Sequence, residues 1–206
     1  MQIKIFETLS STQTFLLENP QENLCILARK QTQGIGSRGN IWNEVEKGLY
    51  FSFCLKKEKL PDDLALQSAS IYFGFLFKET LRQYGYEIWL KWPNDLYIKE
   101  KKVGGVMVNS KADFVICGIG LNYRTKNSNF GALGIELDSE QLLEKFFSFL
   151  KKSEKWKQIF SKYRLEFSKN FNFTFHYQGK VLDLSSAKLC DDGCIEINGE
   201  RIYSLR

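Results

Sequence analysis

A carboxylate, a lysine and a pair of glycines lie within eleven residues near the middle of this sequence. Asp95 ends a Pro-Asn-Asp turn after an apolar strand pattern, and Lys102 precedes Gly104 and Gly105. Pro93 lacks an N–H donor, so strand pairing should stop there. Glycines without a Cβ admit a ligand or another backbone. A carboxylate and an ammonium beside such a gap suit an anionic ligand, although an ordinary hairpin with a charged tip gives the same pattern.

Residues 31–42 form a second candidate site, a polar, glycine-rich segment after an apolar strand pattern. Gly34, Gly36 and Gly39 match the dinucleotide-binding spacing G-x-G-x-x-G. In that fold a helix begins at the third glycine and faces the pyrophosphate, but here only nine residues precede the next strand. No acidic residue ends that strand to hold a ribose. We therefore interpret the segment as a plain loop or as a loop whose backbone N–H groups wrap an anion.

Two further elements could line a pocket. Residues 10–13, Ser-Ser-Thr-Gln, have the form of a capping box, which predicts a helix that begins near Ser11. Gly118-Ile-Gly-Leu-Asn122 ends a strand predicted over 112–121, and its glycines would allow a ligand to approach. By pattern alone, the first is a simple helix cap and the second an ordinary turn.

The elements that must position these motifs follow from hydrophobic periodicity. Further strands are predicted over 1–6, 23–30 and 48–55. Helices are predicted from Pro61 to about Tyr84 with Gly85 as a stop, and over 139–151 and 154–167.

The pattern of predicted elements changes near residue 172. Short strand patterns alternate there with turns at Gln178-Gly179, 191–193 and Asn198-Gly199, the last a strong two-residue hairpin signal. We predict a main domain over 1–171 and a small β-module over 172–206. About 35 residues are too few for independent stability, so the module should pack on the main domain.

Bulk composition favours one folded domain with this appendage. The 206 residues are 43% hydrophobic and 15% aromatic, enough for a sizeable core. The net charge of +5 includes no run of five basic residues, which favours a solvated surface over attraction to an acidic partner. Five cysteines without a Cys-x-x-Cys pair and one histidine make a zinc site hard to assemble. The free thiols, together with an N-terminal segment that does not resemble a signal peptide, suggest a reducing cytosol. No apolar run is long enough to span a membrane.

The paired segments Lys91-Trp-Pro-Asn-Asp95 and Lys102-Val-Gly-Gly105 resemble the core signature of the biotin protein ligases, which attach biotin to a carboxylase lysine. The loop over 31–42 resembles that family's adenylate-binding loop. Ser11-Thr-Gln13 resembles its Ser-Thr-Asn element, and the segment 118–122 resembles its Gly-x-Gly-x-Asn strand end. The likeness covers roughly residues 5–125 and starts almost at Met1, so we expect a short form without the N-terminal DNA-binding domain.

The loop departs from the family pattern at three positions. Ile35, Ser37 and Asn40 stand where that pattern has arginine, which leaves Arg38 as the loop's guanidinium. This departure supports an alternative in which the chain binds biotin without turnover. A second alternative is a lipoate or octanoyl transferase, although those enzymes lack the Trp-Pro-Asn-Asp run.

The resemblance implies an α+β fold: a mixed, mostly antiparallel sheet with helices on one side, followed by an SH3-like β-module. It implies ATP-dependent formation of biotinyl-5′-AMP and transfer of biotin to a lysine of a biotin carboxyl carrier protein or carboxylase domain. ATP and biotin would be substrates and Mg²⁺ would be required, with no dedicated metal ligands. We expect a cytoplasmic protein without specific DNA or membrane binding, and a homodimer is compatible with this interpretation.

The resemblance also assigns roles residue by residue. The catalytic residues are Lys102 and Asp95. The biotin-binding residues are Ser11, Thr12, Gln13, Gln31, Gly34, Ile35, Gly36, Ser37, Lys102, Gly105 and Gly118. The ATP- or adenylate-binding residues are Arg38, Gly39, Trp42, Lys91, Asn94 and Asn122.

Overall fold

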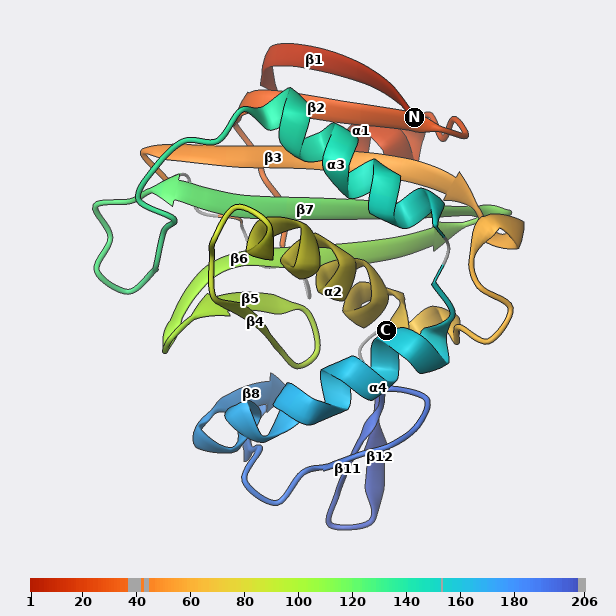
Figure 1. The fold of residues 1–206 in the computed structure, drawn as a ribbon, viewed down its shortest axis with the longest axis vertical. Coiled ribbons are helices and arrows are strands. Elements are labelled where there is room, and N and C mark those ends of the chain that lie inside the picture. Colours follow the sequence, from red (N-terminus) through yellow and green to blue (C-terminus); the bar gives the residue numbers. More distant parts are fainter. Residues whose placement is uncertain (37–41, 43–44, 153, 204–206) are drawn as a thin grey trace.

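A seven-stranded sheet forms the centre of the molecule in the computed structural model, which describes residues 1–36, 42, 45–152 and 154–203 (Figure 1). The strand order is β1-β2-β3-β7-β6-β5-β4. β1 and β2 are parallel and the other neighbours are antiparallel, which confirms the predicted mixed, mostly antiparallel sheet. The strands are β1 (Gln2–Leu9), β2 (Leu24–Gln31), β3 (Lys47–Lys56), β4 (Ile88–Lys91), β5 (Asp95–Ile98), β6 (Lys101–Lys111) and β7 (Phe114–Arg124).

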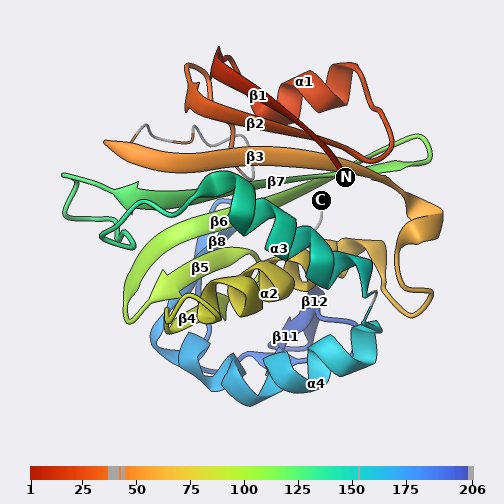
Figure 2. The same ribbon diagram turned by 45° about the horizontal axis from the view of Figure 1, so that its top comes forward.

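Helices cover both faces of this sheet. α2 (Ala69–Arg82) and α3 (Ser139–Lys151) lie on one face, where Cys25 and Leu27 of β2 join the main core (Figure 2). The alternate residues Leu24 and Ile26 face the other way and pack with Leu16 of α1 (Thr12–Glu18). The predicted helical layer is therefore α2 and α3, whereas the short α1 closes a smaller core on the opposite face. Successive strand residues point to opposite faces, so β2 serves both cores.

The helix predicted from residue 61 begins eight residues later than expected, at Ala69. Residues 61–68 form turns and a short 3₁₀ segment, η3 (Leu66–Ser68). The carboxylate of Asp63 instead accepts hydrogen bonds from the backbone of Trp156 and Lys157 at the start of α4 (Trp156–Glu166). The predicted stop at Gly85 is confirmed by a φ of +85°, where a Cβ would be strained. No described helix is long and apolar enough to cross a membrane.

The C-terminal residues form two small antiparallel sheets beneath α4 (Figure 1). All three predicted turns are present, with positive φ at Gln178-Gly179, at Gly193 and at Asn198-Gly199. A 3₁₀ segment, η4 (Phe167–Asn172), connects them to α4. The strands are β8 (Thr174–Tyr177), β9 (Lys180–Asp183), β10 (Lys188–Leu189), β11 (Ile195–Ile197) and β12 (Glu200–Ile202).

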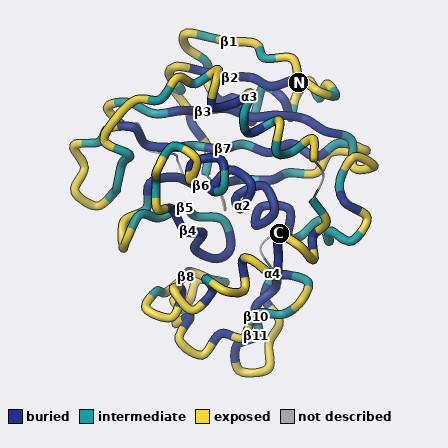
Figure 3. Tube along the Cα trace, viewed as in Figure 1, coloured by how far each residue is buried: buried dark blue, intermediate teal, exposed yellow. Residues whose placement is uncertain are grey.

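These strands share the core of the main sheet. Residues of the central strands and of α2 are mostly buried, while many residues of the outer turns are exposed (Figure 3). Ile195 and Ile202 belong to the same buried cluster as the α2 side chains. Trp92 stacks edge-on against Phe175 at 5.1 Å between ring centroids. The packing agrees with the expected dependence of this segment on the rest of the chain, and the boundary at 171/172 remains a proposal.

Candidate active site

The hairpin β4–β5 and its neighbour β6 bring the first candidate residues together. Asp95 opens β5 and lies opposite Gly105 of β6. The Nζ of Lys102 lies 2.6 Å from Oδ1 of Asp95, and these side chains are 31% and 19% exposed. The predicted pairing of a lysine and a carboxylate at the strand ends is therefore present, and both residues line a cavity.

A β-bulge makes this ion pair possible. The register between β5 and β6 shifts between Leu96 and Tyr97, so that Tyr97 lies opposite Lys102 while Leu96 lies opposite Gly104. The extra residue, Val103, reverses the side-chain alternation of β6. Lys102 consequently shares the face of Asp95; without the bulge it would point to the opposite face. Burial, together with the charge of Asp95, raises the pKa of Tyr97.

Glycines on β6 and β7 hold the indole ring of Trp42. A Cβ on Gly120 would lie 2.6 Å from the ring, and one on Gly105 would lie 3.2 Å from it. The Nζ of Lys102 lies 5.8 Å from the ring centroid, within the range of a cation–π contact. The gap predicted beside the glycines therefore has Trp42 as one wall.

Helix α1 supplies a polar end to the same cavity. Ser11 caps the helix by accepting a hydrogen bond from the amide of Thr14, which confirms the predicted helix start. The amide of Thr12 donates to Oε1 of Gln31 at 2.7 Å, and the Thr12 and Ser52 hydroxyls lie 2.8 Å apart. These bonds fix the helix to β2 and β3.

Gln13 does not close the predicted capping box. Its Nε2 donates to Oδ1 of Asn109 and to the carbonyl of Ile116, both at 3.0 Å. Its buried Oε1 accepts no hydrogen bond within the described ranges, and a Cβ on Gly118 would approach it to 2.5 Å. A glycine at 118 thus keeps an oriented acceptor open to a ligand N–H.

One cavity joins these elements. It includes about 630 Å³ of space between atoms, part of which is open to solvent. The predicted residues that line it are Ser11, Thr12, Gln13, Gln31, Ile35, Gly36, Trp42, Asn94, Asp95, Lys102, Gly105 and Gly118. Asn94 is fixed there by donating to the carbonyl of Val106 at 2.7 Å.

Three predicted residues lie outside this lining. Gly34 packs between Gln31 and Trp42. Lys91 is buried, with its Nζ about 5.8 and 5.7 Å from the rings of Tyr97 and Phe173. Asn122 donates to the carbonyl of Gly131 at 3.0 Å and so holds the segment after β7. Ser37, Arg38 and Gly39 lie outside the described residues, and the binding roles of the whole set remain predictions.

Sequence reasoning missed several residues of the lining. Ser52 and Met107 line the cavity, and Asn109 orients the Gln13 side chain by accepting its hydrogen bond. Ser52 carried a usable signal, because it is a polar residue inside the aromatic strand β3. Asn109 carried none, because its partner is 96 residues away.

Comparison with known proteins agrees with this geometry. The sequence model of the Biotin/lipoate A/B protein ligase family matches residues 5–122. The bifunctional ligase/repressor BirA of Escherichia coli is 30% identical over 131 residues, which are 58% of this chain and 40% of that protein. The biotin–protein ligase of Homo sapiens is 29% identical over 126 residues, 54% of this chain and 17% of the human protein. The chain therefore matches less than half the length of these curated relatives.

Solved structures extend the similarity to the whole chain. The biotin acetyl coenzyme A carboxylase synthetase of Helicobacter pylori, with bound biotinylated ATP, has a TM-score of 0.93 and 40% identity, covering 98% of both chains. The biotin protein ligase of Aquifex aeolicus, in complex with biotin and ATP, has a TM-score of 0.80 and 25% identity, covering 99% of this chain and 95% of that one. Given the family match over more than half of its residues and this shared architecture, the chain belongs to the biotin/lipoate A/B protein ligase family.

Proposed function

We propose that this chain is an ATP-dependent biotin–carboxyl carrier protein ligase. It forms biotinyl-5′-AMP and then transfers biotin to a lysine of a biotin-dependent carboxylase subunit. The observation that carries the proposal is a cavity whose lining includes both the polar group at Gln13 and Gly118 and the Lys102–Asp95 pair. The similar structures that hold biotin with ATP, or biotinylated ATP, support the same substrates.

The cavity suits the shape and chemistry of biotin. Its polar end offers the Gln13 Oε1 acceptor and the hydroxyls of Thr12 and Ser52, which match the rigid donors and acceptor of a ureido ring. Gly118 lies opposite Met107, and Gly120 lies opposite Gly105, so the cavity floor follows β6 and β7 toward Asp95. Two strand residues span about 7 Å. The acyl chain would run along this floor with its carboxylate near Lys102.

Lys102 then acts where negative charge develops. An oxygen of the biotin carboxylate attacks the α-phosphorus of ATP, and pyrophosphate leaves. The ammonium group stabilises the carboxylate and the α-phosphate together as charge builds in the transition state. Trp42 forms the wall beside Lys102 and is proposed to face the adenine.

Asp95 serves the second half of the reaction. The amine of the acceptor lysine attacks the carbonyl carbon of the mixed anhydride, and AMP leaves. Asp95 lies in hydrogen-bond reach of Lys102 and can orient the incoming amine or accept its proton. ATP enters as its magnesium complex, and such ions commonly keep several waters and use one or two carboxylates. Asp95 fits that requirement as the carboxylate of this cavity's lining.

The decisive experiment is incubation of the chain with MgATP, biotin and a biotin carboxyl carrier domain. The expected result is a mass increase of the acceptor by one biotinyl group. Parallel reactions contain lipoate or octanoate with a lipoyl domain. Modification of the lipoyl domain alone would establish the alternative transferase, and biotin binding without acceptor modification would establish a non-catalytic binding module.

The remaining partner assignments are proposals of the same kind. We place the activity in the cytoplasm because all five cysteines are free thiols. We propose no specific DNA or membrane partner for this chain, because its basic residues are dispersed. A homodimer is testable by sedimentation with and without biotin and ATP.

A further inference from the structure

Two cysteines face each other across the hairpin β10–β11, outside the lining of the candidate active-site cavity. Leu189 lies opposite Ile195, so the same register places Cys190 opposite Cys194. The amide of Cys190 donates to the carbonyl of Cys194 at 2.9 Å, which confirms this pairing. Opposite residues of an antiparallel pair have Cα atoms about 4.5–5.5 Å apart and share a face. That separation lies within the range that a disulfide requires.

The side chains at this hairpin converge. The ligand atoms of Cys190, Asp192 and Cys194 all lie within 4.8 Å of one another, and this is the single group of at least three metal-ligand side chains among the described residues. A soft cation is nevertheless a poor occupant. Arg201 donates to Sγ of Cys194 at 3.2 Å and to Oδ2 of Asp192 at 2.9 Å, so a fixed positive charge already contacts two of the three groups.

The turn between the two cysteines is held rigidly. The Asp191 carbonyl accepts from Trp156 Nε1 at 2.9 Å, and the Gly193 carbonyl accepts from Trp92 Nε1 at 3.0 Å. The Asp192 carbonyl accepts from the hydroxyl of Ser68. Three successive carbonyls are thus bonded to side chains of the main domain, and the cysteines are held in register without a covalent link.

We propose that Cys190 and Cys194 form a dithiol modification site that closes to an intramolecular disulfide by exchange with a small-molecule disulfide. Formation of this disulfide costs little conformational entropy, because the fold already brings both sulfurs together. The proposal concerns the hairpin alone and does not depend on the ligase activity.

The two cysteines have different roles in the exchange. Cys190 is partly exposed, whereas Cys194 is buried and its pKa is raised to about 12. The Cys190 thiolate therefore attacks the reagent disulfide first, releases one thiol and forms a mixed disulfide. The Cys194 thiolate, which forms beside the Arg201 guanidinium, then attacks the Cys190 sulfur and releases the second thiol. Two electrons pass to the reagent, and the two protons end on the released thiols.

The test is equilibration of the full chain with glutathione and glutathione disulfide at set ratios, followed by alkylation and peptide mapping. The expected product is a Cys190–Cys194 disulfide, formed at a glutathione disulfide level at least tenfold lower than in the same chain unfolded by urea. Cys25, Cys54 and Cys117 provide the internal control. They are buried in the sheet and their thiol pKa values are raised, so they should stay reduced in the folded protein.

Cys194→Ser is the matched variant. It should stop at a glutathione adduct on Cys190 while circular dichroism shows an unchanged fold; if it does not fold, the wild-type comparison with urea decides alone. Equal disulfide formation in folded and unfolded chains, or a persistent adduct on wild-type Cys190, would overturn the proposal. Protection of both thiols by micromolar Zn²⁺, without closure by glutathione disulfide, would overturn it in favour of a metal site.

Discussion

At the scale of single residues, the direction of a side chain decides whether it lines the cavity, more than its residue type does. Lys102 reaches Asp95 because one bulged residue, Val103, brings the lysine to the cavity face. Its neighbour Lys101 has the same charge but points elsewhere and donates to the carbonyl of Ser128. Adjacent lysines on one strand therefore have different contacts, and the pair provides a controlled comparison.

Lys102→Ala should abolish most adenylate formation. Loss of one preorganised charge costs on the order of 3–4 kcal/mol of transition-state stabilisation, roughly 10²–10³ in rate. The measurement is pyrophosphate release with biotin and MgATP. Lys101→Ala serves as the control, since it removes an equal charge outside the cavity and should remain near the wild-type rate. A Lys102→Ala rate within threefold of wild type would refute the proposed role.

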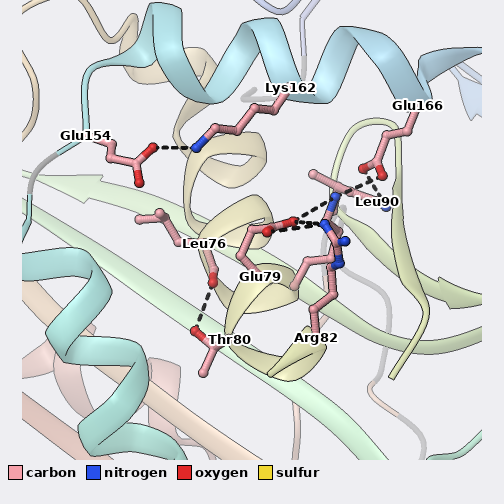
Figure 4. Close-up of polar contacts among 9 residues, drawn as sticks. Leu76, Glu79, Thr80, Arg82, Leu90, Glu154, Lys162 and Glu166 are labelled. Atoms are coloured by element: carbon pink, nitrogen blue, oxygen red, sulfur yellow. Dashed lines mark hydrogen bonds and ion pairs between the residues drawn. The ribbon is translucent and has the colours of Figure 1, made fainter. Parts of the chain in front are cut away.

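At the scale of elements, α4 and η4 support β4, the strand that leads into the turn at residues 92–94. β4 is an edge strand, and its outward amides are bonded by side chains instead of another strand. Leu90 N donates to Glu166 at 3.3 Å (Figure 4), and Trp92 N donates to Asn170 at 2.8 Å. Glu166 also forms an ion pair with the buried Lys78 at 2.8 Å. Glu166 and Asn170 lie about one helical turn apart, so their side chains reach the amides of Leu90 and Trp92, which are two residues apart along the chain.

Asn170→Ala should therefore leave a buried amide of Trp92 without an acceptor. An unsatisfied buried donor costs about 1–3 kcal/mol. Urea denaturation should show this loss, while the exposed Asn172→Ala stays within about 0.5 kcal/mol of wild type. Equal effects of the two substitutions would show that Asn170 does not support this strand.

The start of α4 offers a second prediction at this scale. Oδ1 and Oδ2 of Asp63 accept from the amides of Trp156 and Lys157 at 2.9 and 3.1 Å. Burial raises the pKa of this carboxyl, but the two amide bonds and nearby Lys155 outweigh that effect and lower it. A carboxyl with a lowered folded-state pKa stabilises the fold above its unfolded pKa of about 3.9, and this stability is lost as the pH falls through the folded value.

Asp63→Asn should reduce the free energy of unfolding by about 1 kcal/mol at pH 7, because it weakens this cap. The difference from wild type should begin to shrink near pH 4, where the carboxyl of the unfolded wild type takes up a proton, and should disappear as the pH falls through the lower folded pKa. Urea unfolding at pH 7 and pH 3.5 measures both values. Asp62→Asn, on the exposed neighbouring residue, should match wild type at both pH values. A pH-independent deficit in Asp63→Asn would rule out the charge as its cause.

At the scale of the whole molecule, the small C-terminal sheets complete the core of the large one. Leu184, Ile195, Ile197 and Ile202 are each at most 6% exposed and belong to the main buried cluster. Burial of one such side chain contributes about 1.5–3 kcal/mol. Since a whole domain is stable by only about 5–15 kcal/mol, the two parts should fold together.

A chain ending at residue 171 should consequently fail to fold. Circular dichroism and urea titration would then show no cooperative transition, in contrast to one transition for residues 1–206. If the shortened chain unfolds cooperatively, with a free energy within about 2 kcal/mol of the full chain, the two regions are independent domains.

The sequence by itself determined the features that local chemistry controls. The helix over 139–151, the stop at Gly85 and the turns at Gln178-Gly179 and Asn198-Gly199 match the structure, because periodicity and positive φ are properties of neighbouring residues. The motifs at 11–13, 31–42, 91–105 and 118–122 together identified the family and most of the cavity lining.

Tertiary structure decided what depends on partners distant in the chain. Asp63 caps α4 instead of extending α2, and Gln13 reaches Asn109 instead of its own helix end. The bulge at Val103 set the direction of Lys102, because a strand pattern shows alternation but not where the register shifts. Such contacts depend on which segments meet in the folded chain. No window of neighbouring residues contains that information.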